Sequence, residues 1–463
     1  MSETIKSVKE YISKEGAKQA FKRAENVIKT KPECENAIIT YSNPDFSKVT
    51  NESGKLYGIP IVISDNISTK DIETTCASNI LKGYIPPYKG DAEQKLEAEG
   101  AVILGKGNIN EFLIPNAPSF IGDVKNPYDD KYTAGPAGGC AVSVLAGSVP
   151  VSVASDAYGA VRLSASYTGI TGFRPTYGAI SRYGLIYNSG STDQVSILAN
   201  KVSDCATVAN VLGGHDKRDT MSLLDPLDFE KGVSKARKKI YDSDLLEGIK
   251  IGIPENFIEG ADFEIVKNFE KAIKIFESLG AVCETCWFEA AEFSNEIHEI
   301  ITAGEASAML AKYDGTRFGQ RIDSDNWHEM VAKTRTLFGK SVQDEIIFGT
   351  NLLRSKQIQK YYMKALKLRT DLVEEINSLF KTYDFLISPT TIKIPAVSKD
   401  LENWFLTDKS ITSINLAGLP AISVPFKKYN GIPTGIQIAG NLKKDSDVLK
   451  TAYIFEKKSK GEN

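Results

Sequence analysis

The sequence is poor in histidine and offers no familiar catalytic histidine motif. Its 463 residues include three histidines, His215, His298 and His328, and none has a serine elbow of the G-x-S-x-G type nearby. Serine-histidine-aspartate hydrolysis is therefore disfavoured, and we expect each histidine to be solvated or satisfied by a hydrogen bond. Neither G-x-G-x-x-G nor G-x-x-x-x-G-K-[ST] occurs between a strand and a helix, so nucleotide binding has no support.

Cysteine is also scarce, and its spacing forms no recognisable framework. The six cysteines are Cys34, Cys76, Cys140, Cys205, Cys283 and Cys286. Their scatter does not resemble a disulfide scaffold and predicts a reducing, cytoplasmic location. Cys283 and Cys286 form one CxxC, but a zinc site needs about four ligands, and no second pair or histidine cluster accompanies them. We expect two ordinary strand cysteines, and neither a metal nor a cofactor.

Long apolar runs and a strong net charge are missing as well. No apolar run of about 18 residues occurs, which excludes an ordinary membrane-spanning helix, and residues 1–30 lack the apolar core of a signal peptide. The formal net charge of −3 gives no global attraction to nucleic acid or to membranes, so any tRNA contact must be local or supplied by a partner. Apolar residues make up 42% of the chain, as in ordinary soluble globular proteins.

The patterns that are present indicate an α/β protein. Residues 58–66 and 101–108 are rich in β-branched residues, and the helical stretch 91–100 between them ends at a glycine. Residues 135–178 are rich in small residues; their apolar content favours close packing over a linker. We divide the chain into an N-terminal helical segment (1–54), a first part of the core (55–222), a mostly helical insertion (223–380) and a C-terminal part of the core (381–463).

Four long stretches, taken together, resemble the amidase signature family. They are residues 58–69, 133–147, 154–185 and 414–440, with the sequences GIPIVISDNIST, TAGPAGGCAVSVLAG, ASDAYGAVRLSASYTGITGFRPTYGAISRYGL and INLAGLPAISVPFKKYNGIPTGIQIAG. Residues 304–321 and 346–372 are similar to the A subunit of the glutamyl-tRNA(Gln)/aspartyl-tRNA(Asn) amidotransferase. The resemblance implies a large mixed β-sheet flanked by helices on both faces, with a mostly helical insertion.

The resemblance also implies a serine-cis-serine-lysine triad in place of a histidine-based one. In the family the lysine lies in K-D-N, the cis-serine in G-G-S-S-G-G, and the nucleophilic serine in D-T-G-G-S-I-R, whose tight turn forms the oxyanion hole. The chemistry demands this arrangement because a hydroxyl is a weak nucleophile. It needs a base within hydrogen-bond reach, and a neutral lysine acting through a second hydroxyl can serve.

Carried over position by position, the triad is absent from this chain. Asp65 and Asn66 match the first motif, which puts Ser64 where the lysine belongs. Pro136 takes the place of the cis-serine and Ala160 that of the nucleophile. The separation between Pro136 and Ala160 equals the family's spacing, so a shift of one residue rescues neither serine.

Neighbouring positions of the family's site have changed too. Tyr158 stands at a glycine position of the oxyanion turn, where its ring would occupy space left for substrate or strain the backbone. Asp344 and Glu345 replace a basic pair associated with the glutamine carboxylate, and would repel that group. Asp408 matches an aspartate that faces the substrate's amino group.

Pro136 suggests how the loop has kept its shape. A cis bond before a non-proline residue costs about 2.5 to 4 kcal/mol, whereas before proline the trans preference is only about 0.5 to 1 kcal/mol. We therefore predict that the Gly135-Pro136 peptide bond is cis.

Three functional hypotheses follow. The first is a catalytically inactive subunit, bound to B-subunit-like and C-subunit-like partners and meeting tRNA only indirectly, with no membrane contact. The second is an active amidotransferase A subunit or amidase with a rewired site, in which Cys140 is the candidate nucleophile and Lys70 or Lys106 the candidate base. The third is a small-ligand binding protein that uses the old cleft. Loss of all three triad groups favours the inactive subunit over the rewired enzyme, since triad members act as a unit. The motifs shared with the A subunit favour the inactive subunit over the small-ligand binding protein.

Overall fold

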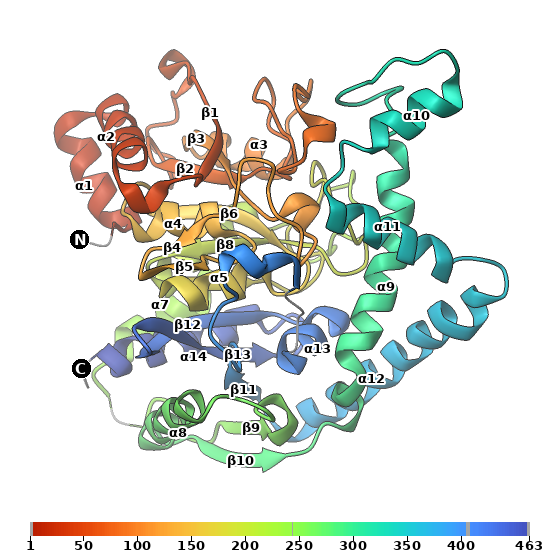
Figure 1. Ribbon diagram of the computed structural model, residues 1–463. Helices are drawn as coiled ribbons and strands as arrows, with labels where there is room; N and C mark the ends of the chain where they lie inside the picture. The colour runs from red at the N-terminus through yellow and green to blue at the C-terminus, as the bar shows by residue number, and fades with distance from the viewer. Residues whose placement is uncertain (1–2, 243, 404–407, 461–463) are drawn as a thin grey trace.

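The computed structural model is built around one large mixed β-sheet, shown in Figure 1, and describes residues 3–242, 244–403 and 408–460. From one edge to the other, the strands are β1 (Ile38–Tyr41), β3 (Val102–Gly107), β2 (Pro60–Ser64), β6 (Val151–Asp156), β8 (Gln194–Ala199), β7 (Thr171–Arg174), β12 (Ala421–Tyr429), β13 (Ile432–Gly440), β11 (Phe385–Pro389), β9 (Lys250–Pro254) and β10 (Val282–Cys286). A separate two-stranded sheet joins β4 (Lys125–Asn126) to β5 (Asp129–Thr133).

The helices surround this sheet. They are α1 (Ile5–Glu15), α2 (Ala17–Thr30), α3 (Asp91–Ala98), α4 (Gly138–Leu145), α5 (Ala160–Thr168), α6 (Val202–Leu212), α7 (Glu230–Lys239), α8 (Phe263–Ser278), α9 (Ser294–Met309), α10 (Trp327–Arg335), α11 (Lys340–Leu352), α12 (Met363–Thr382), α13 (Lys409–Ala417) and α14 (Asp445–Ser459). Among the described residues, no helix is long and apolar enough to cross a membrane.

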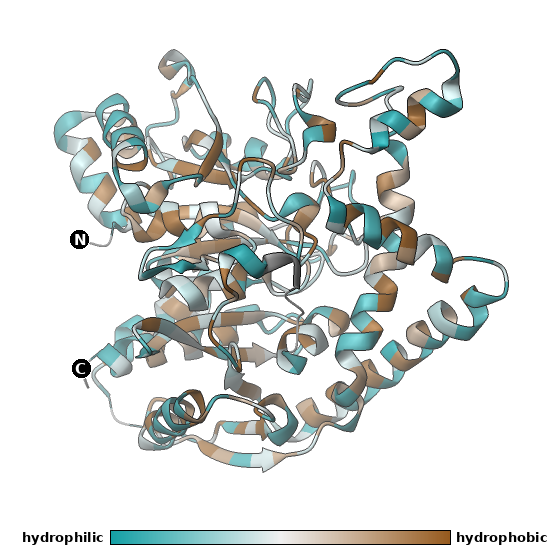
Figure 2. Ribbon diagram, viewed as in Figure 1, coloured by the Kyte–Doolittle hydropathy of each residue, from teal (hydrophilic) through white to brown (hydrophobic). Residues whose placement is uncertain are grey.

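Alternation along the strands divides the interior into a core on each face of the sheet. Ile61 and Ile63 of β2 pack with residues of α1, α3, α6, α7, α8 and α14. Val62, between them, packs on the other face with residues of α2, α4 and α5. Successive side chains of a strand point to opposite faces, so both faces of a buried strand must be apolar. Figure 2 shows the corresponding concentration of apolar residues on the strands. Helices cover both faces, as predicted.

The sequence-based elements of the N-terminal half are confirmed. Amphipathic helices α1 and α2 lie within the first 30 residues, and β2, α3 and β3 follow as strand, helix and strand. Strands β2 and β3 are parallel neighbours, as a strand-helix-strand unit requires.

The CxxC lies in β10, a strand as expected. Residues 223–380 supply α7 to α11, nearly all of α12, and also β9 and β10, which extend one edge of the main sheet.

Candidate functional site

The structure brings two of the three expected triad positions onto neighbouring elements. Pro136 lies in the loop between β5 and α4, and Ala160 is the first residue of α5. The backbone N–H of Ala137 donates to the Oγ of Ser164 at 2.9 Å. Because Ser164 lies one helical turn beyond Ala160, this bond holds the loop against the start of α5.

Ser64, the third position, joins the same region through a hydrogen-bonded chain. It is the last residue of β2, and its hydroxyl donates to Asn66 Oδ1 at 2.6 Å. Asn66 Nδ2 in turn donates to the Oγ of Ser155, near the end of β6, at 2.8 Å. All three side chains are buried. None of them titrates near neutral pH, so this chain of groups offers no base to a hydroxyl nucleophile.

The predicted cis peptide bond before Pro136 is wrong. The described residues contain no cis peptide bond. Gly135 makes the turn instead, with φ +98°, a region open to glycine, and its N–H donates to the hydroxyl of Thr133 at 3.0 Å. The Pro136 carbonyl then accepts from the backbone N–H of Asn110 at 2.9 Å. The positive φ of Gly135 thus produces the bend that we had expected from a cis peptide bond.

Tyr158 fills the interior beside the start of α5. It is 1% exposed and packs in a cluster with Leu163, Tyr167 and Ile411. Its hydroxyl accepts from Asn110 Nδ2 at 3.4 Å, and burial raises its pKa well above the usual value. The ring therefore stands as a neutral, packed side chain at a position where the family motif has glycine.

Little space remains beside the Pro136 loop. A cavity lined by Asn110, Thr133, Pro136 and Tyr167, among others, has a volume of about 10 Å³. This is about the space that a single water molecule needs. An amino acid or other small metabolite has no room there without movement of the lining.

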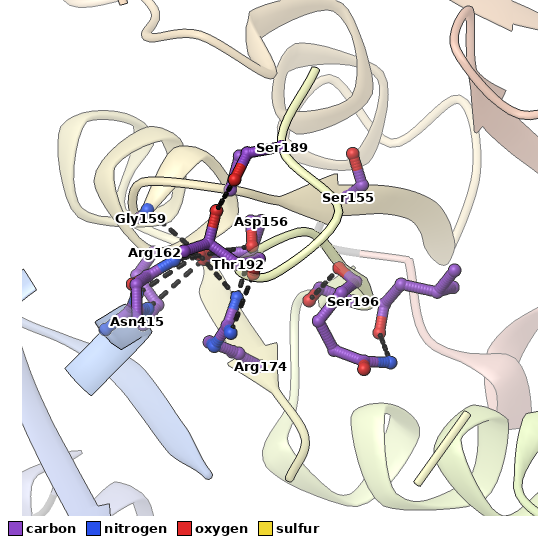
Figure 3. A network of polar contacts seen from close by, with 12 residues as sticks. Ser155, Asp156, Gly159, Arg162, Arg174, Ser189, Thr192, Ser196 and Asn415 are labelled. Atoms are coloured by element: carbon purple, nitrogen blue, oxygen red, sulfur yellow. Dashed lines mark hydrogen bonds and ion pairs between the residues drawn. The ribbon is translucent and has the colours of Figure 1, made fainter. Parts of the chain in front are cut away.

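The turn from β6 into α5 is held by a buried ionic network (Figure 3). The Asp156 carboxylate accepts from the Gly159 N–H at 2.8 Å and from Asn415 Nδ2 at 2.9 Å. It also pairs with the guanidiniums of Arg162, at 3.1 Å, and Arg174, at 3.3 Å. Burial alone would raise the pKa of Asp156, but the two guanidiniums outweigh it and hold the pKa well below its ordinary range. The family's turn is therefore kept in place by charges, independently of any nucleophile.

The candidate replacement nucleophile, Cys140, is buried and protonated. It lies in the first turn of α4 with no exposed surface, and burial raises its pKa to about 12. At neutral pH the thiolate, which is the nucleophilic form, is scarce. The expectation of a small buried residue at the start of a helix is confirmed.

The candidate bases are no better placed. Burial lowers the pKa of Lys106 to about 8, but its ammonium donates to the Ile67 carbonyl and, at 2.8 Å, to the hydroxyl of Thr69. Lys106 pairs across the strands with Ile63, which faces the α3 side of the sheet. Alternation directs the Lys106 side chain away from the α4 side, where Cys140 lies. Its ammonium is still near enough to oppose the rise in the pKa of Cys140, but burial outweighs that effect. Lys70 is exposed.

One histidine supports the site, which the sequence did not indicate. His298 of α9 is buried, and its Nε2 lies 3.2 Å from the Ala157 carbonyl. Burial lowers its pKa to about 4, so at neutral pH the ring is uncharged and Nε2 donates to that carbonyl. The residues lie 141 positions apart, which leaves no local signal in the sequence. His215 and His328 are exposed.

The acidic positions lie in two separate environments. Asp408 is buried, its carboxylate accepts from the Ile392 N–H at 2.8 Å, and burial raises its pKa to about 6. Asp344 is exposed and pairs with Lys340 of the same helix. Burial and the nearby Glu299 carboxylate raise the pKa of Glu345 to about 7. In the described ranges, no group of three or more histidine, cysteine or acidic residues is arranged to hold a metal ion.

Comparison with known proteins matches these features to one family. The family model described as Amidase matches residues 21–449. The glutamyl-tRNA(Gln) amidotransferase A subunit of Methanococcoides burtonii is 39% identical over 414 residues, 88% of this chain and 85% of that protein. The protein of the same name from Methanosarcina mazei is 38% identical over 468 residues, 98% of this chain and 96% of its own.

Two solved structures share the fold of this chain. The crystal structure of the glutamyl-tRNA(Gln) amidotransferase A subunit from Thermotoga maritima matches with a TM-score of 0.82 and 30% identity, over 99% of this chain and 95% of that one. A bacterial aryl acylamidase also gives a TM-score of 0.82, at 21% identity, over 99% of this chain and 96% of that one. The second likeness concerns the fold alone.

Proposed function

The chain belongs to the amidase family, and we propose that within it the protein is a catalytically inactive homologue of the amidotransferase A subunit. It serves as a structural or regulatory subunit of a tRNA-dependent amidotransferase-like complex. One observation carries the proposal: Ser64, which we align with the family's lysine, belongs to a buried chain of hydrogen bonds with Asn66 and Ser155 that contains no titratable group. Ala160 offers no nucleophile at the start of α5.

A rewired enzyme is the weaker alternative. It would need a thiolate at Cys140 and a proton acceptor beside it. Burial raises the pKa of that thiol to about 12, and the strand register directs Lys106 to the other face of the sheet. The thiol is therefore protonated at neutral pH, and the ammonium of Lys106 donates to the Ile67 carbonyl and the Thr69 hydroxyl.

A small-ligand binding protein is also less well supported. The cavity of about 10 Å³ beside Pro136 accepts about one water molecule. Tyr158 packs against Leu163 and Ile411 and does not line an open pocket there. Asp408, which we assign to the old amino-group subsite, is occupied by the Ile392 N–H.

The subunit role is supported by the extent of the similarity. The amidotransferase A subunit from Methanosarcina mazei matches 98% of this chain. We infer B-subunit-like and C-subunit-like partners, contact with tRNA only indirectly through them, and a cytoplasmic location. We propose the same four-part division of the chain as above, at residues 1–54, 55–222, 223–380 and 381–463.

Co-purification tests the subunit role. The tagged chain, expressed at its native level and isolated under mild conditions, should bring down a stoichiometric partner, identified by mass spectrometry. Recovery of the chain only as a free monomer would contradict the subunit role. Ammonia release by the same preparation tests the catalytic half: turnover of glutamine that Cys140→Ala abolishes would establish the rewired enzyme instead.

A further inference from the structure

A lysine-lined groove lies between α7 and α14, on the side of the sheet away from α4 and α5. The two helices pack against each other, and both bury apolar residues in the same core (Figure 1). The groove has a volume of about 540 Å³ and is lined by Lys235, Ala236, Lys238, Lys239, Asp242, Asp244, Leu245, Lys450 and Ile454. The lining thus contains four lysines, two aspartates and three apolar residues.

The four lysines make no close ion pair among the described residues, although Lys450 also lines a second pocket with Asp384 and Asp447. Within the described residues, none of Lys235, Lys238, Lys239 and Lys450 has a carboxylate oxygen within 4.0 Å. On α14, Lys457 and Lys458 follow Lys450 at seven and eight residues, which places them on the same side of the helix. In a chain whose net charge is −3, this is a local concentration of positive charge suited to a polyanion.

An exposed tyrosine immediately precedes Asp242, one of the residues that line the groove. Tyr241, two residues beyond the end of α7, is 97% exposed. Lysines beside an exposed tyrosine are the combination that holds single-stranded nucleic acid, because phosphates meet the charges and a base stacks on the ring. A membrane surface fits less well: the apolar residues of α7, Val233 and Ala236, are buried in the core, which leaves no apolar face for lipid.

We propose that this groove binds the phosphodiester backbone of single-stranded RNA, with Tyr241 stacking on a base. The inference does not depend on the proposed loss of catalysis, since the groove and the degenerate site lie on opposite sides of the sheet. It assigns to this chain a direct RNA contact, and so departs from the purely indirect contact with tRNA inferred above.

Fluorescence anisotropy of a labelled oligouridylate with the purified full chain tests the proposal. Binding should weaken linearly with the logarithm of salt concentration. The double reversal Lys238→Glu/Lys239→Glu should weaken binding about tenfold or more, and should flatten the logarithmic salt slope by about 1.4, at about 0.7 per phosphate lost. Tyr241→Ala should weaken binding roughly tenfold, whereas Tyr241→Phe should retain it.

A matched control distinguishes loss of binding at the groove from an effect of the overall charge of the protein. Lys18→Glu/Lys22→Glu on α2 makes the same change in charge at exposed positions on the other face and should leave the affinity unchanged. Equal weakening by both double variants would overturn the proposal, as would RNA affinity no greater than that of inorganic phosphate. Loss of binding to phosphatidylserine vesicles in Lys238→Glu/Lys239→Glu, with RNA binding intact, would also overturn it. Unchanged circular dichroism and thermal midpoints would show that each variant is folded.

Discussion

At the scale of single residues, the Asp156 carboxylate is the group on which the old site's shape depends most. It is buried, and it neutralises both Arg162 and Arg174 while also holding the Gly159 N–H. A buried ion pair is not a large net source of stability, because desolvation opposes it. Removing one partner is costly, however, because the remaining charges stay buried without compensation.

Asp156→Asn should therefore lower the free energy of unfolding by about 3 to 5 kcal/mol, since it leaves two buried guanidiniums without their counterion. Urea denaturation followed by fluorescence measures the change. The matched control is Asp344→Asn, which removes an exposed carboxylate paired with Lys340 and should cost no more than about 0.5 kcal/mol. A loss below about 1 kcal/mol in Asp156→Asn would show that the network contributes little.

Asp193 gives the protein a pH-dependent stability. It is buried, and burial raises its pKa to about 7, although the Ser189 and Asn188 N–H groups oppose the shift. The ordinary aspartate pKa is about 3.9, so between pH of about 4 and about 7 the folded protein holds a proton that the unfolded chain releases. The contribution of Asp193 is full below this window and is lost as pH rises through it.

Asp193→Asn removes this dependence. Its stability relative to the wild type should increase as pH rises from about 5 to about 7, by at most about 1.4 kcal/mol per pH unit, and should level off above that. Urea midpoints at a series of pH values measure this difference. If the curves for variant and wild type run parallel across the window, the carboxyl group does not titrate there.

At the scale of elements, the start of α5 depends on a glycine. Gly159 precedes the helix with φ +87°, and a Cβ there would lie 2.4 Å from Ile411 Cγ2. Gly159→Ala should cost about 1 to 2 kcal/mol for the left-handed backbone and a further 1 to 3 kcal/mol for overpacking. Thermal and urea unfolding measure the loss.

Gly248→Ala is the matched control for that prediction. Gly248 has a similar φ of +76°, and a Cβ there would meet nothing within 4 Å, so only the backbone cost applies. The difference between the two variants isolates the contact with Ile411. Equal losses would mean that α13, which carries Ile411, shifts freely to accept the methyl group.

Local patterns are sufficient to predict some elements and not others. The run of β-branched residues in β2 and the glycine stop after α3 predict both elements, because these signals involve only neighbouring residues. The prediction of a cis bond at Pro136 is wrong because the bend depends on the backbone of Gly135 and on a bond to Asn110 from another loop. Nothing within the loop's own sequence fixes that partner.

At the scale of the whole molecule, the fold could be predicted more completely than the site. The resemblance to amidases implied the mixed sheet and its helices, and the structure and relatives confirm both. The hydrogen bonds that hold the start of α5 could not be predicted from the sequence. Asn415 lies 259 positions from its partner Asp156, and His298 lies 141 positions from its partner Ala157. Such contacts arise only when distant segments pack together.

The whole molecule therefore has an amidase framework whose turn into α5 is held by Asp156 and His298. At the positions that we align with the family's triad, it carries Ser64, Pro136 and Ala160. Preservation of the framework is consistent with a role that needs the shape and the surfaces of the amidotransferase protein it resembles. Triad members act as a unit in catalysis, so partial residual turnover is not expected from the remaining hydroxyl groups.

Ammonia release from glutamine tests this account most directly. The purified chain, alone and in its co-purified complex, is assayed with heat-denatured protein as the blank. We predict a rate for this chain that equals the blank, both alone and in complex. Turnover above the blank that is lost in Cys140→Ala or Lys106→Ala would contradict the account and identify a rewired catalytic site.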